Sequence, residues 1–87
     1  MNIPFSPPDI TEEEVKAVAD VLRSGWITTG PVTKKFEEKM SASAGRKYGI
    51  AVANGTAALE VAMQAIGIGA GDEVIMPSFT IISCAMA

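Results

Sequence analysis

The chain has 87 residues, of which 48% are hydrophobic, and its formal net charge is -3. This composition is typical of one small globular domain and excludes a disordered polypeptide. Seven Lys and Arg residues stand against ten Asp and Glu residues without a basic run, so we expect no nucleic-acid partner. There is no His and only one cysteine, Cys84, so we expect no metal site, no Ser-His-Asp triad and no internal disulfide.

Targeting signals are equally scarce. The longest uncharged apolar tract, residues 74–87, is shorter than the ~20 residues that a membrane-spanning helix needs. Because no basic and apolar leader is present either, we expect a cytoplasmic protein without a membrane partner.

Residues 1–47 are predicted to hold an extended segment, two helices and the loop between them. Three prolines keep residues 2–10 extended, and Thr11 followed by Glu14 has the spacing of a helix capping box. Gly25 is suited to end this first helix, and a loop with two adjacent hydroxyls, Thr28 and Thr29, follows it. A second amphipathic helix is predicted over about residues 32–42.

Residues 48–87 are predicted to form a β-α-β unit. Residues 48–53 and 73–76 are short apolar runs of strand type, and apolar positions at helical spacing follow Asn54-Gly55-Thr56. The ~30 residues involved suit two parallel strands with a right-handed crossover. The predicted fold class is therefore α/β.

Two short motifs allow a functional and a purely structural interpretation. A helix that begins at Gly55-Thr56 would direct free N–H groups and a hydroxyl at an anion such as a phosphate, but the same residues also suit a plain turn in which Thr56 caps the helix. Thr28-Thr29-Gly30 likewise suits simple capping of the second helix. Trp26 and Phe79 are expected to be core or packing aromatics.

Five motifs in one order give the chain a family resemblance. PFSPPDIT, SGWITTGP, FEEKM, VANGTAAL and GIGAGDEVIMPSFT together resemble the nucleotide-sugar aminotransferases of the DegT type, over essentially all 87 residues. The resemblance implies a type I pyridoxal-phosphate fold, with this sequence at the start of its large domain. It also implies a homodimer that moves an amino group from glutamate to a nucleotide-linked keto sugar, in a pathway to surface polysaccharide or a related glycoconjugate.

The resemblance also implies roles for particular residues. Three of them match the segment that binds the phosphate of pyridoxal 5'-phosphate, namely Gly55, Thr56 and Ala57. Five match segments beside the sugar nucleotide, namely Phe5, Ser6, Thr28, Thr29 and Gly30. The form WITTGP is most similar to members that aminate carbon 4. Ile81 stands where the family usually has an aromatic residue on the cofactor ring, so it is only a candidate cofactor contact.

The catalytic groups of the family have no counterpart among these residues. The lysine that forms a Schiff base with the cofactor, and its acidic partner, are expected beyond Ala87. We therefore expect an amino-terminal fragment that is inactive alone. Two rivals stay open: a sugar dehydratase of the same family, in which a His replaces the lysine, and a non-catalytic nucleotide-binding α/β module.

Overall fold

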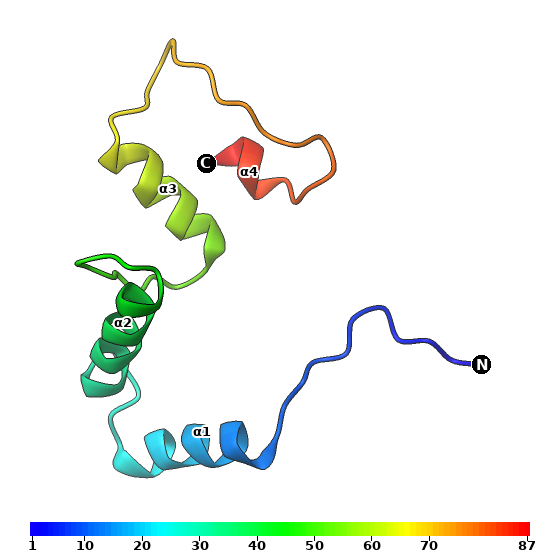
Figure 1. Ribbon diagram of the computed structural model, residues 1–87, viewed down its shortest axis with the longest axis vertical. Helices are drawn as coiled ribbons and strands as arrows, with labels where there is room; N and C mark the ends of the chain where they lie inside the picture. Colours follow the sequence, from blue (N-terminus) through cyan, green and yellow to red (C-terminus); the bar gives the residue numbers. More distant parts are fainter. The chain divides into compact units, whose positions relative to one another are not determined.

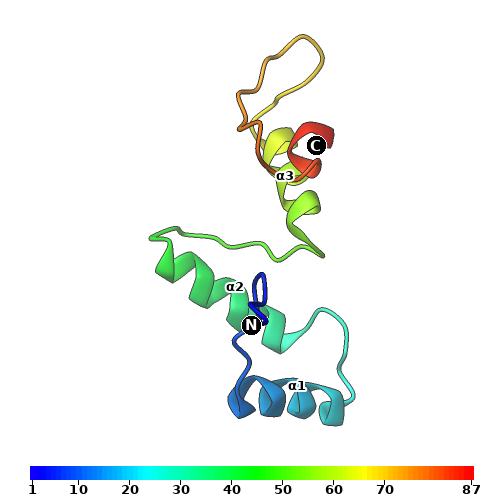
Figure 2. The same ribbon diagram turned by 90° about the vertical axis from the view of Figure 1, so that its right-hand side faces the viewer.

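Helices make up all of the regular secondary structure in the computed structural model, which describes residues 1–87 (Figure 1). The chain divides into two units, Met1–Gly49 and Ile50–Ala87, and each is described by itself. The first unit holds α1 (Glu12–Ser24) and α2 (Pro31–Ser43), and the second holds α3 (Gly55–Ala65) and α4 (Ser83–Met86). Figure 2 shows the loop of residues 25–30 that joins α1 to α2.

Local sequence signals define both ends of α1. The hydroxyl of Thr11 accepts a hydrogen bond from the N–H of Glu13 at 3.2 Å, and the N–H of Thr11 donates to Oε2 of Glu14 at 2.6 Å. At the other end Gly25 adopts a left-handed conformation, with φ of 73°, and its N–H donates to the carbonyl of Leu22. The predicted capping box and glycine terminator are both confirmed.

The second helix, α2, begins without a side-chain cap. Pro31 occupies its first turn, where a missing N–H costs nothing, and the carbonyl of Gly30 accepts from the N–H of Lys34 at 3.0 Å. After α2 the chain returns along the helix, since a Cβ placed on Gly49 would lie 2.6 Å from the carbonyl oxygen of Glu37. Gly49 is therefore required by the close approach of two backbone segments.

In the second unit, α3 begins where the sequence predicts but with a different cap. Oδ1 of Asn54, not the hydroxyl of Thr56, accepts the hydrogen bond from the N–H of Ala57 at 2.9 Å. The chain leaves α3 through Gly67, which has a φ of 79°, and α4 contacts α3.

The predicted α/β class and its β-α-β unit are wrong for this chain. Residues 48–53 and 73–76 form no strand, although α3 lies between them as expected. Parallel strands are stable only where neighbouring strands pair with them and helices cover both faces of the sheet. Nothing here supplies that cover: Ile75, in the second segment, is 101% exposed.

No side chain in either unit is buried. The accessible surface is 8155 Å², whereas a folded monomer of this mass exposes about 4,900 Å². The expectation of core aromatics fails with it, because Phe79 is 99% and Trp26 57% exposed. Trp26 nevertheless packs locally, as described below. A chain of this composition has apolar surface that it does not cover by itself.

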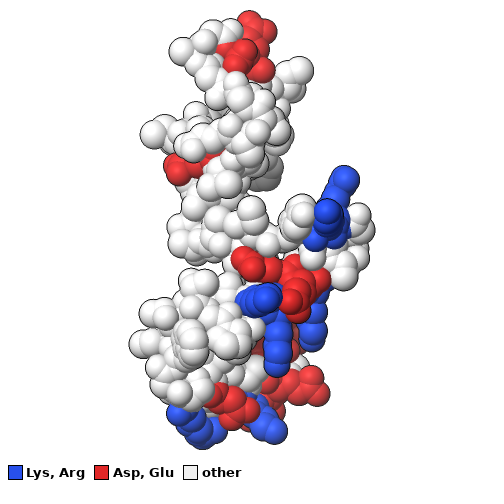
Figure 3. All heavy atoms as spheres, turned by 90° about the vertical axis from the view of Figure 1, so that its left-hand side faces the viewer, with Lys and Arg blue, Asp and Glu red and all other residues white.

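Charge is distributed unevenly between the units. All seven Lys and Arg residues lie in Met1–Gly49, whereas Ile50–Ala87 carries three acidic residues and no basic one. Figure 3 shows the same contrast, with blue side chains only around the first unit. No helix has both the length and the apolar character needed to cross a membrane.

Candidate functional site

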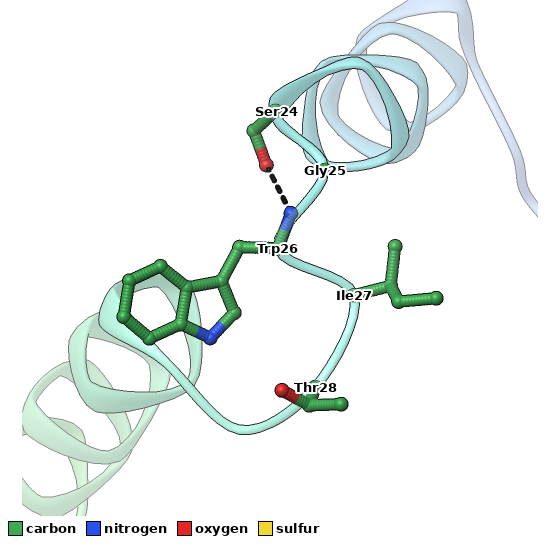
Figure 4. A pocket seen from close by; sticks show the side chains of 5 residues that line it. All are labelled: Ser24, Gly25, Trp26, Ile27 and Thr28. Atoms are coloured by element: carbon green, nitrogen blue, oxygen red, sulfur yellow. Dashed lines mark hydrogen bonds between the residues drawn. The ribbon is translucent and has the colours of Figure 1, made fainter.

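The loop between α1 and α2 has a fixed shape because its own side chains bind its backbone. The hydroxyl of Ser24 donates to the carbonyl of Val21 at 2.6 Å and accepts from the backbone N–H of Trp26 at 3.2 Å (Figure 4). Nε1 of Trp26 then donates to the carbonyl of Thr29 at 3.1 Å. The indole thus joins the second residue of the loop, Trp26, to the last but one, Thr29.

The indole also explains the glycine at the end of the loop. A Cβ on Gly30 would lie 2.4 Å from Nε1 and 2.8 Å from Cε2 of Trp26, which is closer than a Cβ approaches a non-bonded atom. The φ of Gly30 is -166°, a conformation open to every residue. A glycine is therefore needed at position 30 because the indole occupies the place of a side chain there. The backbone conformation of Gly30 does not by itself require glycine.

The two threonine hydroxyls of this loop are unpaired. Thr28 lines a hollow of about 400 Å³ together with Ser24, Gly25, Trp26 and Ile27. Figure 4 shows the indole and the side chain of Ile27 on opposite sides of the loop. Because neither Thr28 nor Thr29 makes a side-chain hydrogen bond, both hydroxyls are available to a polar ligand.

The amino-terminal candidates do not join this loop. Phe5 is 106% exposed and therefore packs against nothing, and Ser6 is exposed beside it. Within the first unit the structure brings Thr28, Thr29 and Gly30 together and leaves Phe5 and Ser6 apart from them.

The start of α3 has the donors of an anion site. The N–H groups of Gly55 and Thr56 and the hydroxyl of Thr56 make no hydrogen bond, whereas the N–H of Ala57 is taken by Asn54. A Cβ on Gly55 would meet no atom within 4 Å, so the space beside Gly55 is open. The positive end of the helix dipole lies at the same place.

Ile81, the candidate ring contact, belongs to the same unit as the start of α3. It is 67% exposed, and its carbonyl accepts from the N–H of Cys84 at the start of α4. A hollow of about 400 Å³ in this unit is lined instead by the far end of α3 and by α4, including Met63, Ile68 and Cys84. None of the four candidate cofactor residues lines it.

The start of α3 has no basic side chain from its own unit that could pair with an anion or react as an amine. The second unit has no Lys or Arg, so an anion held there would depend on backbone N–H groups and one hydroxyl. The five lysines lie in the first unit, on or beside α1 and α2. The one resolved pKa shift lies away from both candidate sites: hydrogen bonds from the side chain and then the backbone of Thr11 lower the pKa of Glu14.

The sequence places Trp26 in this loop, but sequence reasoning missed that Ser24 and Trp26 hold the loop by their hydrogen bonds. The signal was present, since Ser, Trp and Gly stand two to six residues apart in SGWITTGP. A default assignment of Trp26 to the core hid it.

The open helix terminus at the start of α3 could accept an anionic group, and the loop between α1 and α2 carries two unpaired hydroxyls that could bind a polar one. The model of the DegT/DnrJ/EryC1/StrS aminotransferase family matches residues 8–87, nearly the whole chain. The chain belongs to this family, whose members are pyridoxal-phosphate-dependent aminotransferases. No solved structure matches it.

Proposed function

We propose that this chain is the amino-terminal part of a pyridoxal-phosphate-dependent transaminase that moves an amino group from glutamate to carbon 4 of a nucleotide-linked keto sugar. The observation that carries the proposal is the family match over residues 8–87 together with the unpaired donors of Gly55 and Thr56. The pathway would supply surface polysaccharide or a related glycoconjugate, with the enzyme acting as a cytoplasmic homodimer.

The donors at the start of α3 fit the phosphate of pyridoxal 5'-phosphate. Two N–H groups and the hydroxyl of Thr56 can each donate to a phosphate oxygen, and the helix dipole favours the negative charge. Gly55 leaves room for the phosphate to approach the backbone. When bound, the cofactor withdraws electrons from the carbon that carries the amino group.

The substrate side of the proposal rests on the loop. The hydroxyls of Thr28 and Thr29 are free to bind oxygens of the sugar or of the diphosphate, and the loop holds them without a charged residue. Holding the sugar in one orientation is what brings its keto carbon to the amino group, since proximity supplies a large part of such rate enhancements.

The 87 residues are not a complete enzyme in this proposal. No side chain is buried, and none of the five lysines lies in the unit that holds the phosphate donors. The residues that hold the cofactor covalently and cover the apolar surface then belong to the remainder of the protein.

The test is transfer of labelled nitrogen by the intact protein. Incubation with pyridoxal 5'-phosphate, ¹⁵N-glutamate and a nucleotide-linked 4-keto-6-deoxy sugar should give a ¹⁵N-labelled amino sugar, detected by mass spectrometry. NMR of the product should place the nitrogen at carbon 4. Loss of the keto sugar by elimination of water, without nitrogen in the product, would contradict the proposal.

A further inference from the structure

Trp26 has no part in the function proposed so far, yet its backbone N–H and its indole each make a hydrogen bond at the candidate substrate loop, and the indole lies against Gly30. We propose that Trp26 is a positioning residue, which holds Thr28 and Thr29 in the conformation that binds the nucleotide sugar. This inference rests on the proposed function, because it assigns Trp26 to the same substrate site.

The backbone of the loop is held at both ends through Trp26. Its N–H is bound by the hydroxyl of Ser24 at 3.2 Å, which fixes where the loop leaves α1. Its indole Nε1 donates to the carbonyl of Thr29 at 3.1 Å, immediately before α2 begins. The four residues 26–29 are thereby closed into a ring that includes Thr28 (Figure 4).

The indole of Trp26 packs closely against Gly30, in addition to donating its hydrogen bond. Three atoms of the indole lie within 2.9 Å of the position that a Cβ on Gly30 would take. Since the backbone conformation of Gly30 is open to other residues, Gly30 is required only while the indole is there. Trp26 and Gly30 therefore form one unit, and the loss of either should disturb the loop in the same way.

This arrangement leaves the threonine hydroxyls free while fixing the backbone that carries them. A loop ordered before binding loses less conformational entropy when the ligand arrives, and this raises affinity. The aromatic side chain thus affects the nucleotide-sugar site through Thr28 and Thr29, and it need not touch the ligand.

A double-mutant cycle on the intact protein tests the coupling. Dissociation constants for uridine diphosphate and thymidine diphosphate would be measured by calorimetry for the wild type, Gly30→Ala, Trp26→Ala and the double variant. For whichever diphosphate binds, Gly30→Ala should raise the dissociation constant about tenfold, because the added Cβ displaces the indole. In the Trp26→Ala background the same substitution should cause no further loss.

Two further variants separate positioning from general damage. Trp26→Phe keeps a ring beside Gly30 but removes the N–H that binds the carbonyl of Thr29, so KM for the nucleotide sugar should rise about fivefold while KM for glutamate stays unchanged. Gly69→Ala is the matched control, because its Cβ meets no atom within 4 Å and its backbone conformation is ordinary. It should bind the diphosphate like the wild type.

The outcomes distinguish the two proposals. If Gly30→Ala weakens binding by the same factor with and without the indole, Gly30 acts on the ligand directly and the role of Trp26 is refuted. Equal changes in both KM values for Trp26→Phe would refute it too. If the wild type binds neither diphosphate, the nucleotide-sugar substrate class itself is wrong.

Discussion

The side-chain hydrogen bonds described above join residues two or three positions apart. Those of Thr11 with Glu13 and Glu14, of Ser24 with Trp26, and of Asn54 with Ala57 each belong to a helix end or to the loop beside it. Local bonds of this kind depend on the nearby sequence alone. We therefore expect these hydrogen bonds to be kept when the rest of the protein covers the chain.

The capping box of α1 gives a prediction about pH. Because hydrogen bonds from Thr11 lower the pKa of Glu14 in the helix, the carboxylate form is favoured there and stabilises α1 above the ordinary pKa of Glu. This contribution is lost as the pH falls through the lowered pKa. Thr11→Ala removes the hydroxyl, so the pKa of Glu14 should move up toward its ordinary value in an NMR titration of the side-chain carboxyl carbon.

A matched substitution controls for general effects on the charge environment. Thr33→Ala changes a threonine in α2, away from Glu14 in the sequence, and should leave the Glu14 titration unchanged. If Thr11→Ala also left it unchanged, the capping interaction would not hold in solution.

At the scale of elements, the start of α3 combines two tasks that mutation can separate. Asn54 caps the helix, and the donors of Gly55 and Thr56 remain unpaired for the phosphate of the proposed cofactor. In the intact protein, Asn54→Ala should destabilise α3 by about 1 kcal/mol, measured by hydrogen exchange of the α3 amides. Asn54→Asp should keep the cap but place a negative charge beside the phosphate, and so weaken cofactor binding about fivefold.

Equilibrium dialysis of pyridoxal 5'-phosphate supplies the second readout for this pair. Hydrogen exchange in Asn54→Asp should match that of the wild type, so that any loss of binding is electrostatic. Cofactor affinity as high as that of the wild type in Asn54→Asp would contradict a phosphate at this helix terminus.

The helices could be predicted from the sequence because their signals are local. Thr11 with Glu14 and Gly25 mark the two ends of α1 that the structure reproduces, and the helix predicted over about residues 32–42 is α2. The strands could not, because residues 48–53 and 73–76 have the composition of strands but no neighbouring strand or covering helix here. The cap of α3 was predicted at Thr56 because hydroxyl and amide caps are nearly equivalent in sequence.

Within the candidate site, the sequence indicates the loop itself. The interactions that hold the loop in its conformation could not be predicted. Thr28, Thr29 and Gly30 stand out as two hydroxyls before a Gly-Pro pair. The contact of Trp26 with Gly30 depends on a side-chain orientation that spacing does not give. Phe5 and Ser6 are exposed and lie outside the helices, so their predicted place beside the sugar depends on the family resemblance.

At the scale of the whole molecule, the large exposed apolar surface predicts that the isolated chain has a low free energy of unfolding. With no buried side chain, the hydrophobic gain cannot offset the conformational entropy of ordering 87 residues. The purified 87-residue chain should therefore show a broad, non-cooperative loss of helix on heating, followed by circular dichroism, and should bind a hydrophobic dye or aggregate. A sharp transition in a monomeric sample would overturn this expectation.

The unequal division of charge between the two units is consistent with the proposed roles of this chain. The unit Ile50–Ala87 supplies neutral donors for a phosphate and no amine, whereas all lysines lie in Met1–Gly49 among helices of ordinary amphipathic character. In the proposed enzyme this chain positions the phosphate and the sugar, and the group that reacts with the cofactor comes from the remainder of the protein.

The most direct test of this account is to locate the lysine that holds the cofactor. The intact protein, loaded with pyridoxal 5'-phosphate, would be reduced with borohydride, digested and mapped by mass spectrometry. The account predicts a pyridoxyl group on one lysine outside these 87 residues. A label on Lys16, Lys34, Lys35, Lys39 or Lys47, or no labelled lysine anywhere, would contradict it.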